Sequence, residues 1–383
     1  MYKRLRSLLL LFALILSGCG ASVDRDRPAT GESVVTLCAV GDILLTEDML
    51  QDARQSTGAY TFAQQFEHCY GAISAADIAI GNLEGNFTAS SYEEGRYPDI
   101  LAHTLAEAGF DVLQTANSYS IHDGVSGLAR TKSVIQGAGM HALGTYRSEK
   151  EQKKEQVLLL EVKDIRIAFV SFTKGFGGMA LPEDAAYSSN VLYTDYTTNY
   201  ERVNTDGILA VLDKAKKLSP DIIVASVHWG SENVKEISRS QETIANLLLE
   251  NGVSLILGSH PHLAGTIEQR HIKLKNGDRN DAVIAYSLGD FGGAKEDSCK
   301  LSLMLDLEIT RNHATGKTRI TRVGYIPIAA VDLGEEAQNR YAVLNVDNAI
   351  EQYENNYYNR VSSEVYQKLL KGKESLDAAV ILE

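Results

Sequence analysis

The sequence has no internal repeat, no low-complexity tract and no surplus of basic residues. It also lacks cysteine pairs at the spacing of a zinc finger. It has four cysteines and no C-x-x-C pair, which excludes the usual zinc fingers. The net charge of −13 argues against a nucleic-acid-binding protein and against electrostatic docking on anionic lipid. Cys38, Cys69 and Cys299 cannot be paired from the sequence. Because Cys38 lies inside an apolar segment, we expect a buried free thiol there.

The apolar run at the N-terminus is too short for a comfortable membrane span. It covers residues 8–16 behind a basic segment and leads to Leu-Ser-Gly-Cys at Cys19. This end resembles the lipobox of bacterial lipoproteins, in which Cys19 would carry the lipid; an ordinary signal peptide with an incidental cysteine is the alternative. We expect residues 1–19 to be a lipoprotein signal peptide and residues 20–33 a polar tether. Acyl chains would then hold the mature protein at the extracytoplasmic face of the cell membrane.

The remaining chain has the composition of a globular protein, with 44% hydrophobic and 23% charged residues. Apolar strands alternate with amphipathic helices, and β-rich segments dominate residues 156–172 and the part after 282, which predicts an α/β protein with two sheets packed between helices. We expect one domain over residues 34–330 and a charged, helical tail over 331–383. The expected helices are 47–55, 62–75, 99–109, 125–136, 204–218 and 240–251.

Three histidines stand where two predicted strands end. Residues 221–230 form an apolar strand that ends in His228, and residues 255–262 form a second strand that runs into His260-Pro-His262. Parallel strands deliver such side chains to the carboxyl edge of one sheet, where α/β proteins place their sites. Imidazole is the commonest side-chain ligand of metals, so the pattern predicts a metal site. A histidine pair in a surface loop is the alternative.

Oxygen-bearing side chains follow other predicted strands in the same way. Asp42 comes after the apolar run 34–40, and Asn82 and Glu84 come after the strand 77–80. The polar oxygens therefore arrive at a strand edge with the geometry expected for the histidines. Residues 173–199 are rich first in glycine and then in tyrosine, without a period, and we expect a long loop over the site. The glycines of this loop lack the strand-to-helix context of a phosphate cradle.

Six ordered motifs resemble one bacterial family. They are Gly41-Asp42, residues 82–84, residues 109–111 leading to Ala116-Asn117, residues 228–230, residues 258–262 and residues 286–291. Their order is similar to that of the bacterial capsule-synthesis family (CapA-like, poly-γ-glutamate biosynthesis proteins) over about residues 34–327. That family resembles calcineurin-like metallophosphoesterases. The resemblance implies a four-layer α/β/β/α sandwich with a metal centre at the strand ends.

The resemblance also implies which residues bind metal and what the metal does. The ligands carried over are Asp42, Asn117, His228, His260 and His262, while Asn82 and Glu84 share the position of a bridging carboxylate. Of these two side chains, only that of Glu84 can carry a negative charge. A dinuclear centre would polarise a scissile bond and lower the pKa of a bound water. Mixed oxygen and imidazole ligands favour Mn, Zn or Fe.

The sequence departs from the family pattern at two positions. Tyr119 stands where the family has the histidine that acts as general acid, and a phenol with a pKa of about 10 protonates a leaving group poorly. His122, three residues on, is either a substitute that turns inward or a solvent-facing loop residue. Asp290 stands where the family usually has Asn. These two departures affect the expected catalytic activity, whereas the predicted metal ligands are all present.

Three functions are consistent with this sequence. The first is a lipid-anchored metal-dependent hydrolase that acts on a capsule or other cell-surface polymer. The second is a non-catalytic component of capsule assembly or export that works with capsule-synthesis membrane proteins. The third is a surface protein that binds an anionic polymer, against which the acidic net charge weighs.

Overall fold

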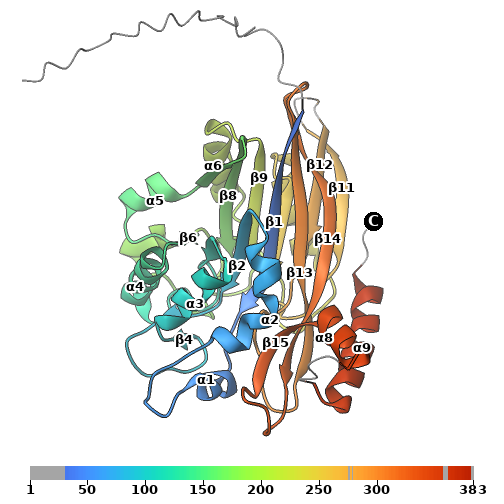
Figure 1. Ribbon diagram of the computed structural model, residues 1–383. Coiled ribbons are helices and arrows are strands. Elements are labelled where there is room, and N and C mark those ends of the chain that lie inside the picture. The colour runs from blue at the N-terminus through green and yellow to red at the C-terminus, as the bar shows by residue number, and fades with distance from the viewer. Residues whose placement is uncertain (1–30, 275–276, 278, 357–360, 381–383) are drawn as a thin grey trace, which may run out of the picture.

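The computed structural model describes residues 31–274, 277, 279–356 and 361–380. The expected signal peptide, Cys19 and most of the expected tether lie outside the described residues. Two large mixed sheets pack face to face, and helices cover their outer faces (Figure 1). A small third sheet pairs β3 (Asn86–Phe87) with β4 (Arg96–Tyr97).

The first large sheet has seven strands in the order β15-β14-β13-β1-β2-β5-β6. Strands β1, β2, β5 and β6 run parallel, and β13, β14 and β15 continue the sheet antiparallel. The strands are β1 (Glu32–Ile43), β2 (Ile78–Leu83), β5 (Val112–Gln114), β6 (His141–Leu143), β13 (Cys299–Asn312), β14 (Lys317–Asp332) and β15 (Tyr341–Asn345).

The second sheet has six strands in the order β11-β12-β10-β9-β8-β7. Its four central strands are parallel, and its two edge strands are antiparallel to their neighbours. The strands are β7 (Leu158–Val162), β8 (Ile165–Thr173), β9 (Ile222–His228), β10 (Leu255–Ser259), β11 (Ile267–Lys273) and β12 (Arg279–Ala285).

The helices lie on the outside of the two sheets (Figure 1). Helices α1 to α3 pack on the seven-stranded sheet, and α6 and α7 pack on the six-stranded sheet. Helices α8 and α9 lie beside β13 and β14. The bounds are α1 (Glu47–Ala53), α2 (Ala63–Ser74), α3 (Ile100–Ala108), α4 (Gly124–Gly137), α5 (Glu149–Glu155), α6 (Thr205–Lys217), α7 (Arg239–Glu250), α8 (Val346–Glu354) and α9 (Ser363–Ala379), with a 3₁₀ turn at Glu183–Ser188.

Strand β1 shows how the sequence produces the layers. Side chains of a strand alternate between its two faces. Val35 and Leu37 accordingly lie in the core between the sheets, whereas Cys38 and Val40 lie in the core under the helices. Both faces of β1 are buried, which explains its continuous apolar run. The predicted four-layer α/β/β/α sandwich is confirmed.

Three elements escaped prediction because their sequences lack a clear period. Helix α5 has no apolar residue, so it shows no helical stripe and is instead capped by Ser148. Edge strand β11 is rich in charge, as exposed edges are, and resembles a loop in sequence. The tail, which we expected to be helical, contains α8 and α9 but also β15, whose five residues pair with β14. Cys38, Cys69 and Cys299 are free thiols, and burial raises the pKa of Cys38 to about 12.

The two sheets meet at Asp42, beside a glycine that allows the contact. The Asp42 N–H donates to the Gly289 carbonyl at 2.9 Å, and Phe291 N–H donates to the Asp42 carbonyl at 2.8 Å. A Cβ on Gly41 would lie 1.8 Å from the Gly289 oxygen. Gly41 therefore permits a close backbone approach that any side chain would prevent.

We predict that Gly41→Ala lowers the free energy of unfolding by about 1–3 kcal/mol or more, the range for overpacked cores. Gly71→Ala in α2 is the matched control, because a Cβ there meets nothing within 4 Å and alanine favours a helix. Chemical denaturation of both variants checks this. Equal stability of Gly41→Ala and the parent would contradict the close contact.

Candidate metal centre

The predicted ligands converge at one edge of the sandwich. Parallel strands of both sheets end there, and α/β proteins place their binding sites at the carboxyl ends of such strands. Each ligand stands at the end of a strand or shortly after it: Asp42 (β1), Asn82 and Glu84 (β2), Asn117 (after β5), His228 (β9), and His260 and His262 (after β10). All are buried except His262, which is partly exposed.

Asp42 is the most connected side chain of this edge. Its Oδ1 accepts a hydrogen bond from Asn82 Nδ2 at 2.6 Å, and its Oδ2 accepts one from the His260 backbone N–H at 3.0 Å. His262 Nδ1 lies 3.3 Å from Oδ2. Burial acts to raise the pKa of Asp42, but the hydrogen bond and charge of His262, with the other donors, hold that pKa below its usual value. Asp42 is therefore held as a carboxylate.

One group of candidate ligands consists of Asp42, His262 and Asp290, whose ligand atoms lie within 4.8 Å of one another. His262 Nδ1 lies 2.8 Å from Asp290 Oδ1, and Lys300 Nζ donates to Asp290 Oδ2 at 2.6 Å. Burial acts to lower the pKa of His262, but hydrogen bonds to Asp290 and Asp42 raise it to about 11. The two carboxylates thus favour a positive charge at this point.

A second group consists of Glu84, His228 and His260, again with ligand atoms within 4.8 Å of one another. His228 Nδ1 lies 3.1 Å from Ser259 Oγ, and its Nε2 lies 3.6 Å from Glu84 Oε1. Among the described residues, Glu84 Oε2 and His260 Nδ1 are buried without a hydrogen-bond partner. Buried polar atoms are normally paired, so these orphaned atoms fit a metal ion.

Burial favours the uncharged forms of all three side chains in the second group. Burial, followed by the charge of Asp42, raises the pKa of Glu84 well above its usual value. Burial, followed by its neighbour His260, lowers the pKa of His228, and burial with Lys174 lowers that of His260 to about 3. The two imidazoles are therefore neutral, which is the form that binds metals.

Asn82 and Asn117 hold the acids in place. Asn117 Nδ2 donates to Asn82 Oδ1 at 3.0 Å, and Asn82 in turn donates to Asp42. The Asn117 amide oxygen accepts the Tyr119 backbone N–H at 3.1 Å. Both amides therefore already have partners, in contrast to Glu84 Oε2.

The turn after β10 is strained at both of its histidines. His260 has φ of 94° and His262 has φ of 59°, although neither residue is glycine. Such conformations cost about 1–3 kcal/mol each and cluster at functional sites. In this turn His260 lies near Glu84, and His262 lies near Asp42 and Asp290.

Tyr119 and His122 differ in their relation to this edge. Burial, followed by the charges of Glu94 and Glu84, raises the pKa of Tyr119 to about 12, and its hydroxyl donates to Glu94 Oε1 at 3.4 Å. His122 is exposed, with its ring 5.5 Å from that of Tyr119. The loop thus leaves His122 on the solvent side.

Sequence reasoning missed Asp290 as a ligand candidate. In the sequence, Asp290 stands out only as a departure from the family pattern, although Gly289-Asp290 repeats the Gly41-Asp42 motif. The signal was present, but the pairing of Asp290 with Asp42 across the two sheets is visible only in the fold.

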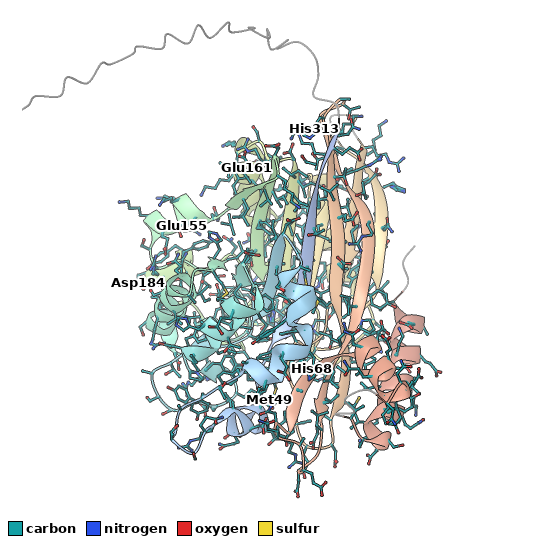
Figure 2. The ribbon with its side chains drawn as sticks, viewed as in Figure 1. Met49, His68, Glu155, Glu161, Asp184 and His313 are labelled. Carbon is teal, nitrogen blue, oxygen red and sulfur yellow. The ribbon has the colours of Figure 1, made fainter. Side chains whose placement is uncertain are left out.

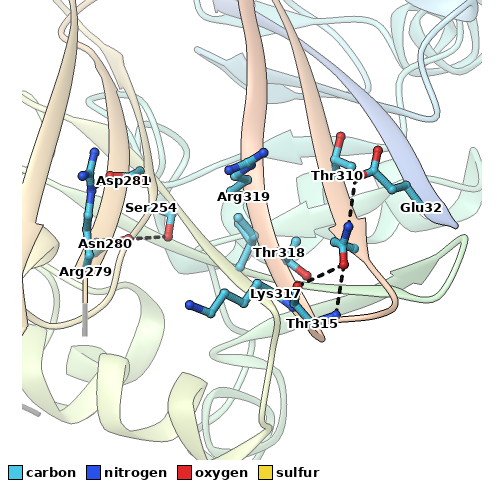
Figure 3. Close-up of a pocket in the computed structure, with 12 residues that line it drawn as sticks. Glu32, Ser254, Arg279, Asn280, Asp281, Thr310, Thr315, Lys317, Thr318 and Arg319 are labelled. Atoms are coloured by element: carbon cyan, nitrogen blue, oxygen red, sulfur yellow. Dashed lines mark hydrogen bonds and ion pairs between the residues drawn. The ribbon is translucent and has the colours of Figure 1, made fainter. Parts of the chain in front are cut away.

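Other features lie away from this edge. A cavity of about 410 Å³ lies at the opposite ends of the same strands, near Ser254, Asn280 and Lys317 (Figure 3). None of the predicted ligands lines it, so its volume does not mark the metal site. His313 lies at the tip of the β13–β14 hairpin, 3.0 Å from Ser33 Oγ, and His68 lies on α2 (Figure 2).

The family follows from comparison with known proteins. Residues 36–293 match the family described as "Bacterial capsule synthesis protein PGA_cap", which is more than half of the chain. The chain belongs to this capsule synthesis family. The sequence resemblance to CapA-like proteins is thereby confirmed.

Curated relatives agree with the family. The capsule biosynthesis protein CapA of Bacillus anthracis is 27% identical over 271 residues, which are 67% of this chain and 59% of that protein. The PGA biosynthesis protein CapA of Bacillus subtilis (strain 168) is 26% identical over 291 residues, which are 74% of this chain and 69% of that protein. The chain therefore spans about three fifths of the length of the first relative.

Two solved structures are similar to this chain over most of its length. The calcineurin-like phosphoesterase YfkN from Bacillus subtilis has a TM-score of 0.45 and 12% identity, covering 91% of this chain and 99% of that chain. A putative 5'-nucleotidase from Staphylococcus aureus has a TM-score of 0.48 and 13% identity, covering 77% of this chain and 54% of that chain.

We predict that the purified protein binds about one or two equivalents of a divalent transition metal, as such ligand sets do. The double variant His260→Ala/His262→Ala should lose most of this metal, because each group loses an imidazole. His141→Ala/His271→Ala is the control, since both histidines are exposed. Elemental analysis by mass spectrometry measures the content, and equal metal in the site variant and the parent would refute the site.

Proposed function

We propose that this chain is a lipid-anchored protein of capsule-polymer biosynthesis or processing that holds a pair of divalent metal ions. One observation carries the proposal. Two acid–histidine groups made of buried or partly buried side chains share one strand edge, whereas a third group includes the exposed Glu232. Glu84 Oε2 and His260 Nδ1 have no partner there among the described residues. A capsule or other cell-surface polymer would be the substrate, with capsule-synthesis membrane proteins as partners.

The two groups divide the ligands between two positions. Asp42, His262 and Asp290 would hold one ion; Glu84, His228 and His260 would hold the other. These mixed oxygen and imidazole donors favour Mn, Zn or Fe. When bound, such a pair polarises a scissile bond and lowers the pKa of bound water, which suits metal-assisted hydrolysis.

The surrounding residues orient these donors. Ser259 Oγ lies 3.1 Å from His228 Nδ1, while His228 Nε2 lies 3.6 Å from Glu84 Oε1 and 3.1 Å from Ser118 Oγ. Lys300 fixes the second oxygen of Asp290, and Asn82 fixes Asp42. Partners of this kind set the direction and basicity of ligands.

Among the described residues, the site lacks an efficient general acid to protonate the leaving group. Tyr119 occupies the family's acid position, and burial with nearby acids raises its pKa to about 12. This favours the second candidate function, a non-catalytic component of capsule assembly or export that keeps the metal. Binding of an anionic polymer without chemistry is a third candidate, weakened by the net charge of −13.

We predict weak or absent phosphodiesterase activity in the parent and a gain of at least about tenfold on Tyr119→His. A general acid contributes about 10²–10⁴-fold, and histidine titrates near neutral pH where tyrosine does not. Turnover of a generic phosphodiester with added Mn²⁺ measures this. Fast turnover by the parent that persists in Tyr119→Phe would show that this position is not needed.

The proposed location rests on the N-terminal sequence. Cys19 follows a basic segment and a short apolar run, as in lipoproteins. Within the described residues, no helix is both long and apolar enough to cross a bilayer. Because the N-terminal sequence resembles a lipobox, we propose that acyl chains on Cys19 attach the protein to the membrane.

We predict that the full-length protein, expressed in a bacterium, partitions into the detergent phase, whereas Cys19→Ala is released or remains unprocessed. Cys299→Ala serves as the control because Cys299 lies in β13, far along the chain from the lipobox. Phase separation and N-terminal sequencing report the result. A wholly soluble parent that begins at Met1 would overturn the anchor.

A further inference from the structure

Lys174 brings a positive charge to the second group of candidate ligands. It directly follows β8, and its backbone N–H donates to the His228 carbonyl at 2.8 Å. Its Nζ donates to the Gly230 carbonyl at 2.7 Å and lies 3.3 Å from His260 Nε2. Its ammonium lies over the Tyr200 ring, 4.6 Å from Nζ to the centroid. The ammonium is thus fixed beside the site.

The Lys174 ammonium makes no salt bridge within the part of the chain that the structure describes. Its side chain is half-buried. Glu232 lines the same pocket but is exposed. Burial lowers the pKa of Lys174, with Glu232 opposing that effect. A partly buried ammonium that forms no salt bridge is costly, so the position suits an incoming anion.

The pocket in front of Lys174 has room for such a group. It encloses about 220 Å³ and opens beside His260. Ser118 lines it too, and Ser118 Oγ lies 3.1 Å from His228 Nε2, so the pocket reaches both imidazoles of the second group. Gly175, Gly177 and Gly178 form its wall without side chains.

We propose that Lys174 and Ser118 form a binding subsite for an anionic oxygen group, phosphate or carboxylate, on a ligand that reaches the metal pair. The metal part rests on the proposed function, whereas the subsite rests on the pocket alone. Lys174 contacts the ligand and selects for its charge. The start of the 173–199 loop, expected from sequence to lie over the site, would then serve recognition.

A second set of basic residues offers a matched control. Lys317 and Arg319 line the cavity at the opposite strand ends (Figure 3). Both are exposed, and they lie away from every candidate ligand. Substitution there removes the same charge from the protein without touching the subsite.

Isothermal titration of the full chain tests the subsite. The probes are inorganic phosphate and a γ-linked glutamate trimer, each with Mn²⁺ and with a chelator. Lys174→Met should weaken binding of at least one probe by about tenfold or more, as for a lost charge-assisted hydrogen bond. Lys174→Arg should retain most binding, Glu232→Gln should strengthen it, and Lys317→Met should leave it unchanged. The probe that responds identifies phosphate or carboxylate.

Metal content and melting temperature are measured on the same samples. Lys174→Met should keep both, which separates loss of anion binding from loss of metal or of folding; if it unfolds, Glu232→Gln and Lys174→Arg carry the test. A parent without metal would refute the proposed function, while the chelated samples would still test the subsite. Failure of the parent to bind either probe, equal binding by Lys174→Met, or weakening by Lys317→Met instead would overturn the inference.

Discussion

The backbone pairing of Asp42 with the segment Gly289–Phe291 is the contact on which the rest of this structure depends. It joins the two sheets at their carboxyl edges, and it requires Gly41 because a side chain there would overlap the Gly289 carbonyl. The pairing sets Asp42 and Asp290 side by side. This contact and the apolar core between the sheets together hold the candidate ligands of both sheets at one edge.

The electrostatics of the edge follow from that contact. Three acids, Asp42, Glu84 and Asp290, are buried within a small volume, where like charges and lost hydration both raise free energy. The first group offsets this with a charged His262, whereas the second leaves Glu84 Oε2 and His260 Nδ1 unpaired. These unpaired buried atoms are the observation that supports the proposed cation site.

Much of the fold and of the site could be predicted from the sequence because both depend on local patterns. The apolar run before Asp42 and the strand before His228 mark parallel strands by themselves, and parallel strands present their ends at a common edge. Elements without a periodic pattern of apolar residues could not be predicted: α5 has no apolar residue, and β15 is short. Asp290 and Lys174 could not be assigned because their importance arises from contacts across sheets and loops distant in sequence.

Anomalous X-ray scattering from crystals grown with Mn²⁺ tests the central claim most directly, because it locates each ion without reference to activity. The account predicts two peaks at the strand edge, one touching Asp42, His262 and Asp290 and the other touching Glu84, His228 and His260. The absence of any peak at this edge, at saturating Mn²⁺ and with the side chains arranged as described, would contradict a metal centre in this protein.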